Sequence, residues 1–300
     1  VNIHEDIKLG LPSRDRYIEN YRETLRRLAR AGVRVVCYNF MPIFDWFRTD
    51  LARELPDGSN ALFYDAGMAC SLTPQQVVES VAGKSNGFTL PGWEPERLAT
   101  LEKLFAQYKG VGVDDLFTNL KYFIDAVIPV CEEFDIRMAI HPDDPPWSIF
   151  GLPRIVTDEA NLARLLALNP STYHGLTLCT GCLGANPSND LPAMIRRFGG
   201  QGRIHFAHTR NIKRFPNGDF TEVSHLSCDG SIDLYEVMKA YHDIGFKGYM
   251  RPDHGRMIWG EKGRPGYGLY DRALGISYIN GLWEAIGQSV TRDGASKRSF

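Results

Sequence analysis

The chain alternates between short runs of apolar residues and longer stretches in which apolar residues recur at helical spacing. A run such as residues 136–141 is too short for a buried helix and rich in strand formers, so it predicts a buried strand. The spacing of Tyr17, Tyr21, Leu25 and Leu28 predicts a helix. By the same criteria, strands are expected at about residues 33–40, 136–141, 175–179, 204–208 and 248–253, and helices at about 13–31, 114–134, 158–168, 191–198, 232–244 and 270–286.

Strands and helices that alternate in units of this length imply parallel strands joined by crossover helices. Such a chain forms an open doubly wound α/β sheet or a closed barrel, and we favour a TIM (β/α)8 barrel, one domain over residues 1–300. Residues 1–4 look like the end of a further strand, and the chain opens at Val1 without an initiator Met. A barrel needs eight strands, so two more are expected in N-terminal sequence that is missing here.

Residues 41–95 show neither pattern clearly. They contain prolines, glycines and aromatic residues in a long excursion from the strand and helix alternation. Long irregular segments inside a compact domain are often functional. We therefore expect a lid over the site or a contact between subunits there, and with it a homo-oligomer, most simply a dimer.

The charge balance argues against two classes of partner. Lys and Arg total 34 against 36 for Asp and Glu, which gives no electrostatic reason to expect nucleic acid or a membrane surface. No apolar run approaches the roughly 20 residues that span a bilayer, and no secretory leader is visible. The six cysteines are irregularly spaced, which is typical of reduced thiols in a cytoplasmic protein.

Potential metal ligands occupy equivalent positions at the ends of four successive predicted strands. These residues are His141, Cys179, His208 and Asp253. The carboxyl ends of parallel barrel strands converge on one face, where active sites are built. Two imidazoles, a thiolate and a carboxylate from these ends predict a site for a divalent metal.

Other interpretations of single residues remain open. Cys179 and Cys182 form a Cys-x-x-Cys motif, which also fits a redox pair or half of a zinc knuckle, although the other cysteines are too scattered to supply a second half. His205 lies three residues before His208, so strand alternation places it on the opposite face in a structural role. His4 is a candidate for the same mouth as the ligands.

Several longer motifs resemble those of the mannonate dehydratase family, and the resemblance runs through nearly the whole chain. The motifs that carry it are His4-Glu5-Asp6-Ile7-Lys8, His141-Pro142-Asp143-Asp144-Pro145-Pro146, Leu178-Cys179-Thr180-Gly181-Cys182-Leu183-Gly184, His208-Thr209-Arg210-Asn211, Arg251-Pro252-Asp253-His254-Gly255-Arg256 and residues 263–275.

The resemblance implies a xylose isomerase-like barrel that dehydrates D-mannonate to 2-keto-3-deoxy-D-gluconate in hexuronate (glucuronate) catabolism. It implies Mn²⁺ or Fe²⁺ as cofactor, held by His141, Cys179, His208 and Asp253. Such a lyase acts on a small sugar acid and needs no nicotinamide or flavin. A ligand set with a cysteine also binds zinc tightly, so the sequence leaves the native metal open.

Three further residues are candidates for catalysis. His254 follows the last ligand and titrates in a useful range, and Tyr267 lies in a loop rich in glycine and proline that could cover the mouth. The sequence does not assign base and acid between them. Arg210 suits a bidentate grip on the substrate carboxylate, and the alternative is an ion pair with Asp143 or Asp144.

Three rival functions fit parts of the pattern. An aldose–ketose isomerase would use the same barrel, but its metal site is usually rich in carboxylates. A metal-dependent nuclease of related fold should have a basic face. A non-catalytic protein that binds metal or sugar acid would keep the ligands but would not need Tyr267 and His254.

Overall fold

The computed structural model describes residues 1–71, 73, 76, 87–88 and 100–296. Its main sheet has five parallel strands in the order β1-β4-β5-β6-β9. These strands are β1 (Val35–Tyr38), β4 (Arg137–Ile140), β5 (His174–Cys179), β6 (Ile204–His208) and β9 (Tyr249–Arg251). They coincide with the five predicted strands. The predicted α/β class with a parallel sheet is therefore confirmed.

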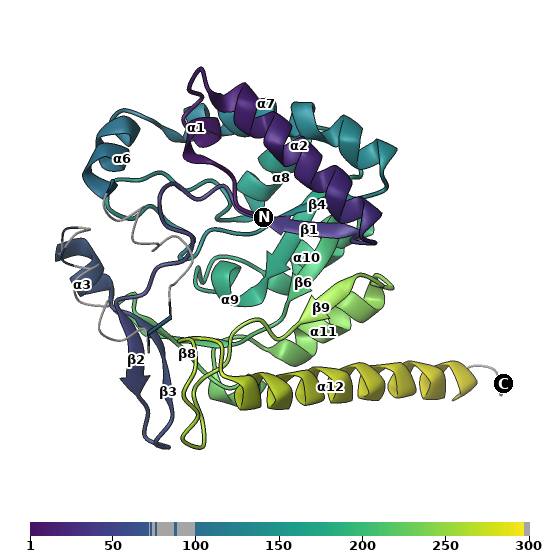
Figure 1. Cartoon of the computed structure of the whole chain (residues 1–300). Coiled ribbons are helices and arrows are strands. Elements are labelled where there is room, and N and C mark those ends of the chain that lie inside the picture. The colour runs from purple at the N-terminus through teal and green to yellow at the C-terminus, as the bar shows by residue number, and fades with distance from the viewer. Residues whose placement is uncertain (72, 74–75, 77–86, 89–99, 297–300) are drawn as a thin grey trace.

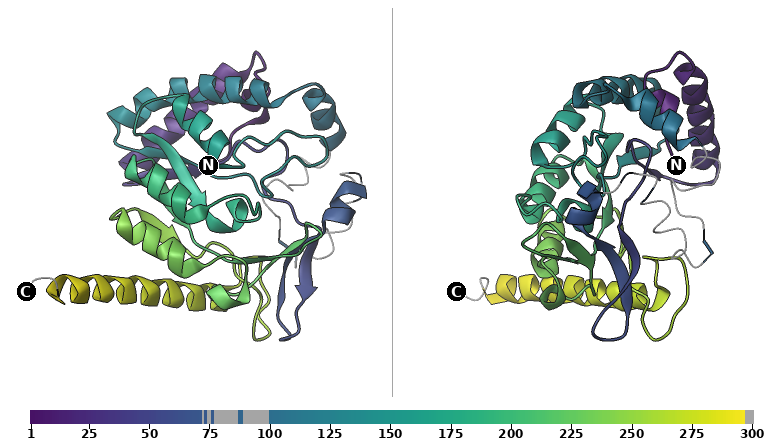
Figure 2. Two further views of the ribbon diagram at one scale, coloured as in Figure 1. Left: turned by 180° about the vertical axis from the view of Figure 1, so that it is seen from behind. Right: turned by 90° about the vertical axis from the view of Figure 1, so that its left-hand side faces the viewer.

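Helices connect these strands and lie around the outside of the sheet (Figures 1 and 2). The main ones are α2 (Arg14–Arg30), α7 (Val113–Glu133), α8 (Glu159–Ala167), α10 (Leu191–Gly200), α11 (Leu234–Asp243) and α12 (Leu269–Ser296). α2 packs against α7, α10 against α11, and α11 against α12. The curled parallel sheet with its outer layer of helices is the arrangement of part of a TIM barrel.

The helix boundaries follow from local chemistry. Asp158, Asp190 and Asp233 each precede a helix and accept hydrogen bonds from backbone N–H groups of its first turn. α12 continues ten residues beyond the predicted end at Ile286. The described residues also form shorter helices: α1 (Glu5–Lys8), α3 (Ala66–Ser71), α6 (Leu101–Tyr108), α9 (Thr180–Leu183) and a 3₁₀ turn at Ser227–Asp229.

A second, antiparallel sheet was not predicted. Its strands are β2 (Asp50–Glu54), β3 (Asn60–Tyr64), β8 (Phe220–Glu222) and β7 (Ile212–Arg214), in that order across the sheet. β2 and β3 belong to the excursion at residues 41–95, which is therefore partly regular structure. Much of the remainder of that excursion lies outside the described residues.

The expected strand end at residues 1–4 is wrong. The structure has no strand there, although the amino group of Val1 donates a hydrogen bond to the carbonyl oxygen of Cys37 in β1 at 2.8 Å. Ile3 is buried, so the apolar pattern is real, but it reflects packing of an extended segment rather than sheet pairing.

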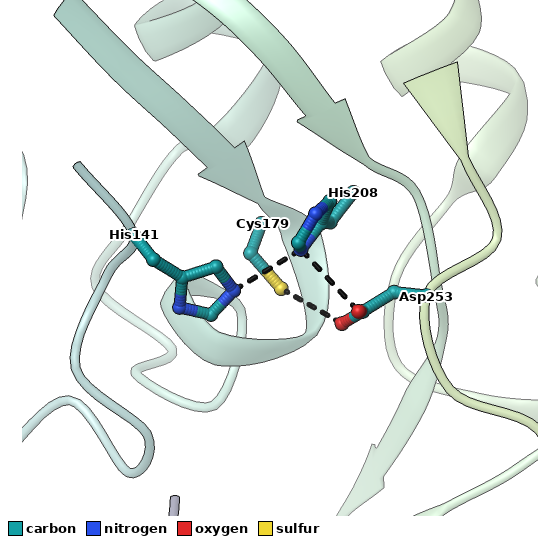
Figure 3. Close-up of side chains that lie close together, drawn as sticks. All are labelled: His141, Cys179, His208 and Asp253. Atoms are coloured by element: carbon teal, nitrogen blue, oxygen red, sulfur yellow. Dashed lines mark hydrogen bonds and ion pairs between the residues drawn. The ribbon is translucent and has the colours of Figure 1, made fainter. Parts of the chain in front are cut away.

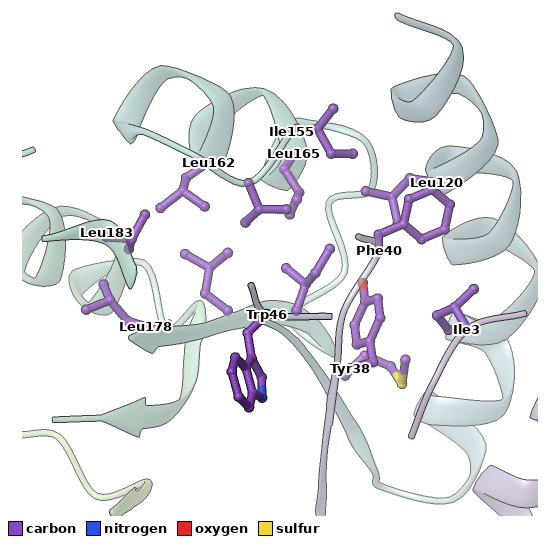
Figure 4. Packing of buried hydrophobic residues seen from close by; sticks show 14 of the residues in the cluster. Ile3, Tyr38, Phe40, Trp46, Leu120, Ile155, Leu162, Leu165, Leu178 and Leu183 are labelled. Carbon is purple, nitrogen blue, oxygen red and sulfur yellow. The ribbon is translucent and has the colours of Figure 1, made fainter. Parts of the chain in front are cut away.

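One large hydrophobic cluster holds the helices on the sheet (Figure 4). Leu162 and Leu165 of α8 pack with Leu178 of β5 and Leu183 of α9 in this cluster, and Leu120 of α7 joins them. Because β5 is buried along its whole length, its last residue is held firmly in place. Among the described residues, no helix is both long enough and apolar enough to cross a membrane.

Candidate metal centre

Four side chains that can bind a metal meet at the carboxyl ends of four neighbouring strands. His141 directly follows β4, Cys179 ends β5 and His208 ends β6, while Asp253 follows β9 by two residues. Strand pairing places Cys179 beside His208 and His208 beside Arg251. Parallel pairing thus brings the side chains to one edge of the sheet, and Figure 3 shows them pointing toward one another.

The potential ligand atoms of these four residues all lie within 4.8 Å of one another. Nε2 of His141 is 3.1 Å from Nδ1 of His208, which in turn is 3.3 Å from Oδ1 of Asp253. The other oxygen of that carboxylate is 3.7 Å from Sγ of Cys179. Two imidazoles, a thiolate and a carboxylate are a donor set typical of divalent transition metals.

The backbone of Asp253 is in the left-handed region, with φ of 57°. Aspartate tolerates this conformation better than most residues, and left-handed residues cluster at functional sites. The turn it makes after β9 carries its carboxylate back toward the other three ligands. Arg251 donates a hydrogen bond to Oδ1 of the same carboxylate at 2.6 Å and so holds its orientation.

Hydrogen bonds around the cluster direct lone pairs inward. Nδ1 of His141 is 2.8 Å from the carbonyl oxygen of Pro142, so it carries a proton, and Nε2 faces the centre and supplies a lone pair there once it is deprotonated. Nε2 of His208 is buried and has no hydrogen-bond partner within the described part of the chain. These residues fit a metal ion, because the facing Nε2 of His141 and Nδ1 of His208, 3.1 Å apart, can both give a lone pair to a cation that Cys179 and Asp253 also reach.

Charges and hydrogen bonds within the cluster shift the pKa values of three of its groups toward their charged forms. Burial alone would raise the pKa of the Cys179 thiol, but the hydrogen bond from Cys182 and the charge of Arg210 hold that pKa well below its ordinary range. Burial alone would lower the pKa of His141, but the hydrogen bond and charge of Cys179 raise it to about 10. Burial opposes ionisation of Asp253 too, and the neighbouring histidines nevertheless keep its pKa far below the usual range. The cluster therefore favours positive charge at its centre.

A buried network of ion pairs lies behind the cluster. Arg48 makes two hydrogen bonds to the carboxylate of Asp144, at 2.7 and 3.0 Å, and one to Glu222 at 3.0 Å. Arg210 pairs with Asp144 at 2.9 Å, with Asp253 at 3.0 Å, and with Glu222. All five side chains are at most 4% exposed. Because an unpaired charge is costly to bury, each of them fixes the position of the others.

His254 and Tyr267 lie beside the ligands. Nδ1 of His254 is 3.1 Å from Oε1 of Glu222, and its Nε2 is 4.0 Å from Oδ2 of Asp253. The imidazole packs edge-on against the rings of Trp46 and Tyr267, with centroids 6.0 and 5.2 Å away. Burial and the charge of Asp253 raise the pKa of Tyr267, so its phenol stays protonated and can donate.

The loop that carries Tyr267 is fixed against the loop that follows Asp253. The N–H of Gly255 donates to the carbonyl of Gly266 at 2.9 Å, and the N–H of Gly268 donates to the carbonyl of Gly255 at 3.0 Å. A Cβ at position 268 would lie 1.8 Å from a backbone oxygen, so only glycine fits there. These glycines permit the close approach that positions Tyr267.

A cavity of about 230 Å³ opens onto the cluster, and both histidine ligands, Asp253, His254 and Tyr267 line it. Cys179 and Arg210 lie behind its wall. A larger cavity of about 960 Å³ lies between α3 and α6 and is lined mainly by apolar side chains. The smaller one is the candidate site, because the ionisable groups converge there.

Some of the residues expected from the sequence meet at the site, and others lie away from it. The four expected ligands and the two candidates for proton transfer come together. Arg210, expected to grip a substrate carboxylate, is 1% exposed and makes the alternative ion pair with Asp144. His205 is buried and lines neither the cavity nor the cluster. His4 does not reach the cavity either, since its Nδ1 accepts a hydrogen bond from a backbone N–H of α1 at 3.1 Å.

Three residues of the site are not predicted by the sequence: Arg48, Glu222 and Trp46. Arg48 and Trp46 lie in the excursion that could not be interpreted, and Glu222 lies in a strand of three residues. Neither Arg48 nor Glu222 belongs to a motif or to a regular pattern of polar and apolar residues in the sequence. Their role follows only from the tertiary structure, which pairs Arg48 with Asp144 and pairs Glu222 with Arg48 and Arg210.

Comparison with known proteins agrees with this arrangement. The family model described as D-mannonate dehydratase (UxuA) matches residues 1–293. A mannonate dehydratase from Thermotoga neapolitana is 63% identical over 292 residues, which cover 97% of this chain and 81% of the relative. One from Geobacillus thermodenitrificans is 59% identical over 286 residues, which cover 95% and 77%.

A solved structure agrees as well. The crystal structure of mannonate dehydratase from Streptococcus suis serotype 2 superposes with a TM-score of 0.86 at 43% identity, covering 97% of this chain and 77% of that one. The family model and the two relatives each match nearly the entire chain, including every strand that carries a candidate ligand. This chain therefore belongs to the D-mannonate dehydratase family.

Proposed function

We propose that this chain dehydrates D-mannonate to 2-keto-3-deoxy-D-gluconate and water, as a step of hexuronate breakdown. The observation that carries the proposal is that three of the four residues of the cluster, His254 and Tyr267 line one cavity of about 230 Å³. Family membership supports the same reaction. An aldose–ketose isomerase is less well supported, because the cluster has a thiolate and two imidazoles but only one carboxylate.

We propose that His141, Cys179, His208 and Asp253 hold Mn²⁺ or Fe²⁺. Imidazole and carboxylate suit both ions, and the thiolate adds a softer donor that Fe²⁺ accepts readily. When bound, a divalent ion acts as a Lewis acid toward the substrate carboxylate and so makes the neighbouring C2 proton more acidic. Everything else in the reaction falls to side chains of the protein.

Dehydration requires a base for the C2 proton and an acid for the hydroxyl that leaves C3. We assign the base to His254. Since Glu222 accepts the hydrogen bond from Nδ1, the other nitrogen carries a free lone pair on the side of the cavity. The carboxylate of Glu222 also stabilises the imidazolium that forms when His254 takes the proton.

We assign the acid to Tyr267. Its raised pKa keeps the phenol protonated, and it lines the same cavity as His254. Proton transfer from the phenol lets the C3 hydroxyl leave as water. The enol product then tautomerises to the 2-keto acid without a redox cofactor.

We assign Arg210 to positioning rather than to substrate contact. Its guanidinium is already shared among Asp144, Glu222 and Asp253, and it is buried behind the cavity wall. It holds the Asp253 carboxylate toward the cluster and neutralises part of the local negative charge.

We further propose a cytoplasmic homodimer. All six cysteines are free thiols in the structure, which suits a reducing compartment. Light scattering of the purified protein measures the mass of the assembly directly, and a monomeric mass would contradict the dimer.

Keto-acid formation from D-mannonate by chelator-stripped protein, with and without added Mn²⁺, tests the function. Product should form only when metal is restored. Cys179→Ser should lose most of its metal affinity, whereas Cys131→Ser, a buried thiol in α7, should behave as wild type. Metal binding without any keto acid from D-mannonate would overturn the proposed substrate, and the same assay on a panel of aldonic acids and aldoses would then find the class.

A further inference from the structure

The Cys-x-x-Cys motif has a second cysteine that the proposed reaction does not use. Cys179 ends β5, and Cys182 lies one turn later in α9, so both sulfurs point to the same side. Sγ of Cys182 is 3.2 Å from Sγ of Cys179, and both residues are fully buried. Within the described part of the chain, no other two cysteine sulfurs are in contact.

We propose that Cys179 and Cys182 form a reversible oxidation site, in which a disulfide and the bound metal exclude each other. The proposal rests on Cys179 being a ligand, as in the proposed function. The same sulfur cannot donate a thiolate lone pair to a metal and also be bonded to Cys182. Oxidation would therefore remove one of the four ligands and the negative charge it carries.

The oxidant is hydrogen peroxide, and the chemistry balances. The Cys179 thiolate attacks one peroxide oxygen, which forms an S–O bond, breaks the O–O bond and releases hydroxide that takes up a proton as water. The Cys182 sulfur then attacks the sulfenic sulfur, which forms the S–S bond, breaks the S–O bond and releases a second water. Two thiols thus lose two electrons and two protons, and one peroxide becomes two waters.

Two features make this pair the preferred place for oxidation. A sulfur at contact distance intercepts the sulfenic acid before further oxidation, which is the arrangement of cysteines with a resolving partner. The cavity comes within one side chain of the pair, since Asp253 lines it and lies 3.7 Å from the Cys179 sulfur, so peroxide in the cavity has to pass only the side chains of the cluster. Cys131 is equally buried, but it lies in α7, and no cysteine sulfur of the described residues is in contact with its own.

The structure also predicts that the metal protects the site. A metal-bound thiolate shares its lone pair with the ion and is a weaker nucleophile toward peroxide. Disulfide formation should therefore be slower in the metal-loaded enzyme by roughly tenfold or more. Oxidation should therefore act on protein that has lost its metal. The disulfide should then prevent the protein from binding metal again until a dithiol reduces the disulfide.

Peptide mapping after peroxide treatment tests the proposal. Metal-stripped and Mn²⁺-loaded protein are treated, alkylated to block the remaining thiols, and digested with trypsin. Residues 165–196 form one tryptic peptide with both cysteines. In the stripped sample this peptide should be unalkylated and lighter by two hydrogens than its reduced form. Mn²⁺ binding of that sample, measured by calorimetry, should be lost and then regained after treatment with dithiothreitol.

Cys182→Ser separates this mechanism from general oxidation. Without the second sulfur no disulfide can form, and peroxide should carry Cys179 to acids that a dithiol does not reduce, so lost Mn²⁺ binding should not return. Cys131→Ser should behave as wild type in every step. A disulfide to Cys37, an unmodified peptide, or equal rates with and without metal would each overturn the proposal. These readouts do not depend on the substrate, so they stand even if D-mannonate is not turned over.

Discussion

The carboxylate of Glu222 accepts a hydrogen bond from Nδ1 of His254 at 3.1 Å, in a site where both residues are at most 5% exposed. Glu222 comes from the antiparallel sheet, whereas His254 follows the last strand of the parallel sheet. Two separate parts of the fold therefore meet at one imidazole. The pairing sets which nitrogen of His254 carries the proton and which faces the cavity.

Replacing Glu222 with glutamine should slow the reaction without weakening substrate binding. The amide keeps the size of the side chain but removes the charge that stabilises the imidazolium. We expect kcat to fall by roughly 10²-fold, with KM changed by less than about threefold. Steady-state kinetics on the Mn²⁺-loaded variant measures the two separately.

Glu222 also pairs with Arg48 and Arg210, so folding must be checked in the same variant. Circular dichroism at the assay temperature should show a folded protein, and Glu159→Gln at the half-exposed start of α8 is the control for a lost surface charge. A Glu222→Gln variant that is folded and retains full kcat would contradict the positioning role.

Tyr267→Phe should abolish most of the activity while leaving the metal site intact. The phenol lines the cavity, and its ring packs against His254 rather than against a proposed ligand. Loss of a general acid costs roughly 10²- to 10⁴-fold in kcat. Tyr270→Phe, three residues later and 49% exposed, is the matched control. Unchanged Mn²⁺ affinity with lost turnover supports the assignment, and activity within a few-fold of wild type would rule it out.

The parallel sheet and the ligand cluster could be predicted because each depends on a short-range signal. A strand buried on both faces is a short apolar run, and β5 is buried at every position. Since the carboxyl ends of parallel strands lie at one edge of the sheet, a potential metal ligand at the end of each run predicts the cluster from the sequence alone. His141, Cys179 and His208 all follow that rule.

The ionic network behind the cluster could not be predicted, because it depends on contacts between residues that are far apart in the sequence. β7 and β8 are three residues long, too short for an alternating pattern to be recognised. Arg48 and Glu222 are 174 residues apart, and only the assembled fold brings them within 3.0 Å. For Arg210 the sequence supported two partners, and burial decides between them, because its guanidinium lies behind the cavity wall among three carboxylates.

His174 should make the fold sensitive to mild acid. Burial lowers its pKa to about 4, while its Nε2–H donates to the carbonyl oxygen of Leu165 at 3.1 Å. The unfolded chain binds a proton near the ordinary value of about 6.5. The folded state binds this proton only at lower pH, so the unfolded state is favoured as the solution becomes acidic. The free energy of unfolding therefore falls as the pH drops from about 6.5 to about 4, by on the order of 3 kcal/mol in total.

His174→Gln should flatten that pH dependence, since an amide keeps a donor for the Leu165 carbonyl and does not titrate. Urea unfolding at several pH values between 7 and 4 measures the difference in slope between variant and wild type. His242→Gln, on α11 at the periphery, serves as control. Parallel curves for His174→Gln and wild type would show that this histidine does not cause the acid sensitivity.

Gly181→Ala should weaken metal binding without touching a ligand. An added Cβ at position 181 would lie 2.4 Å from Cζ of Arg210, so the buried guanidinium would have to move. Arg210 holds the Asp253 carboxylate at 3.0 Å, and displacing it should cost roughly 10- to 100-fold in Mn²⁺ affinity. Gly200→Ala is the control, because a Cβ there meets nothing within 4 Å at the end of α10. Calorimetry on both variants compares the affinities, and wild-type affinity in folded Gly181→Ala would mean that Arg210 does not position Asp253.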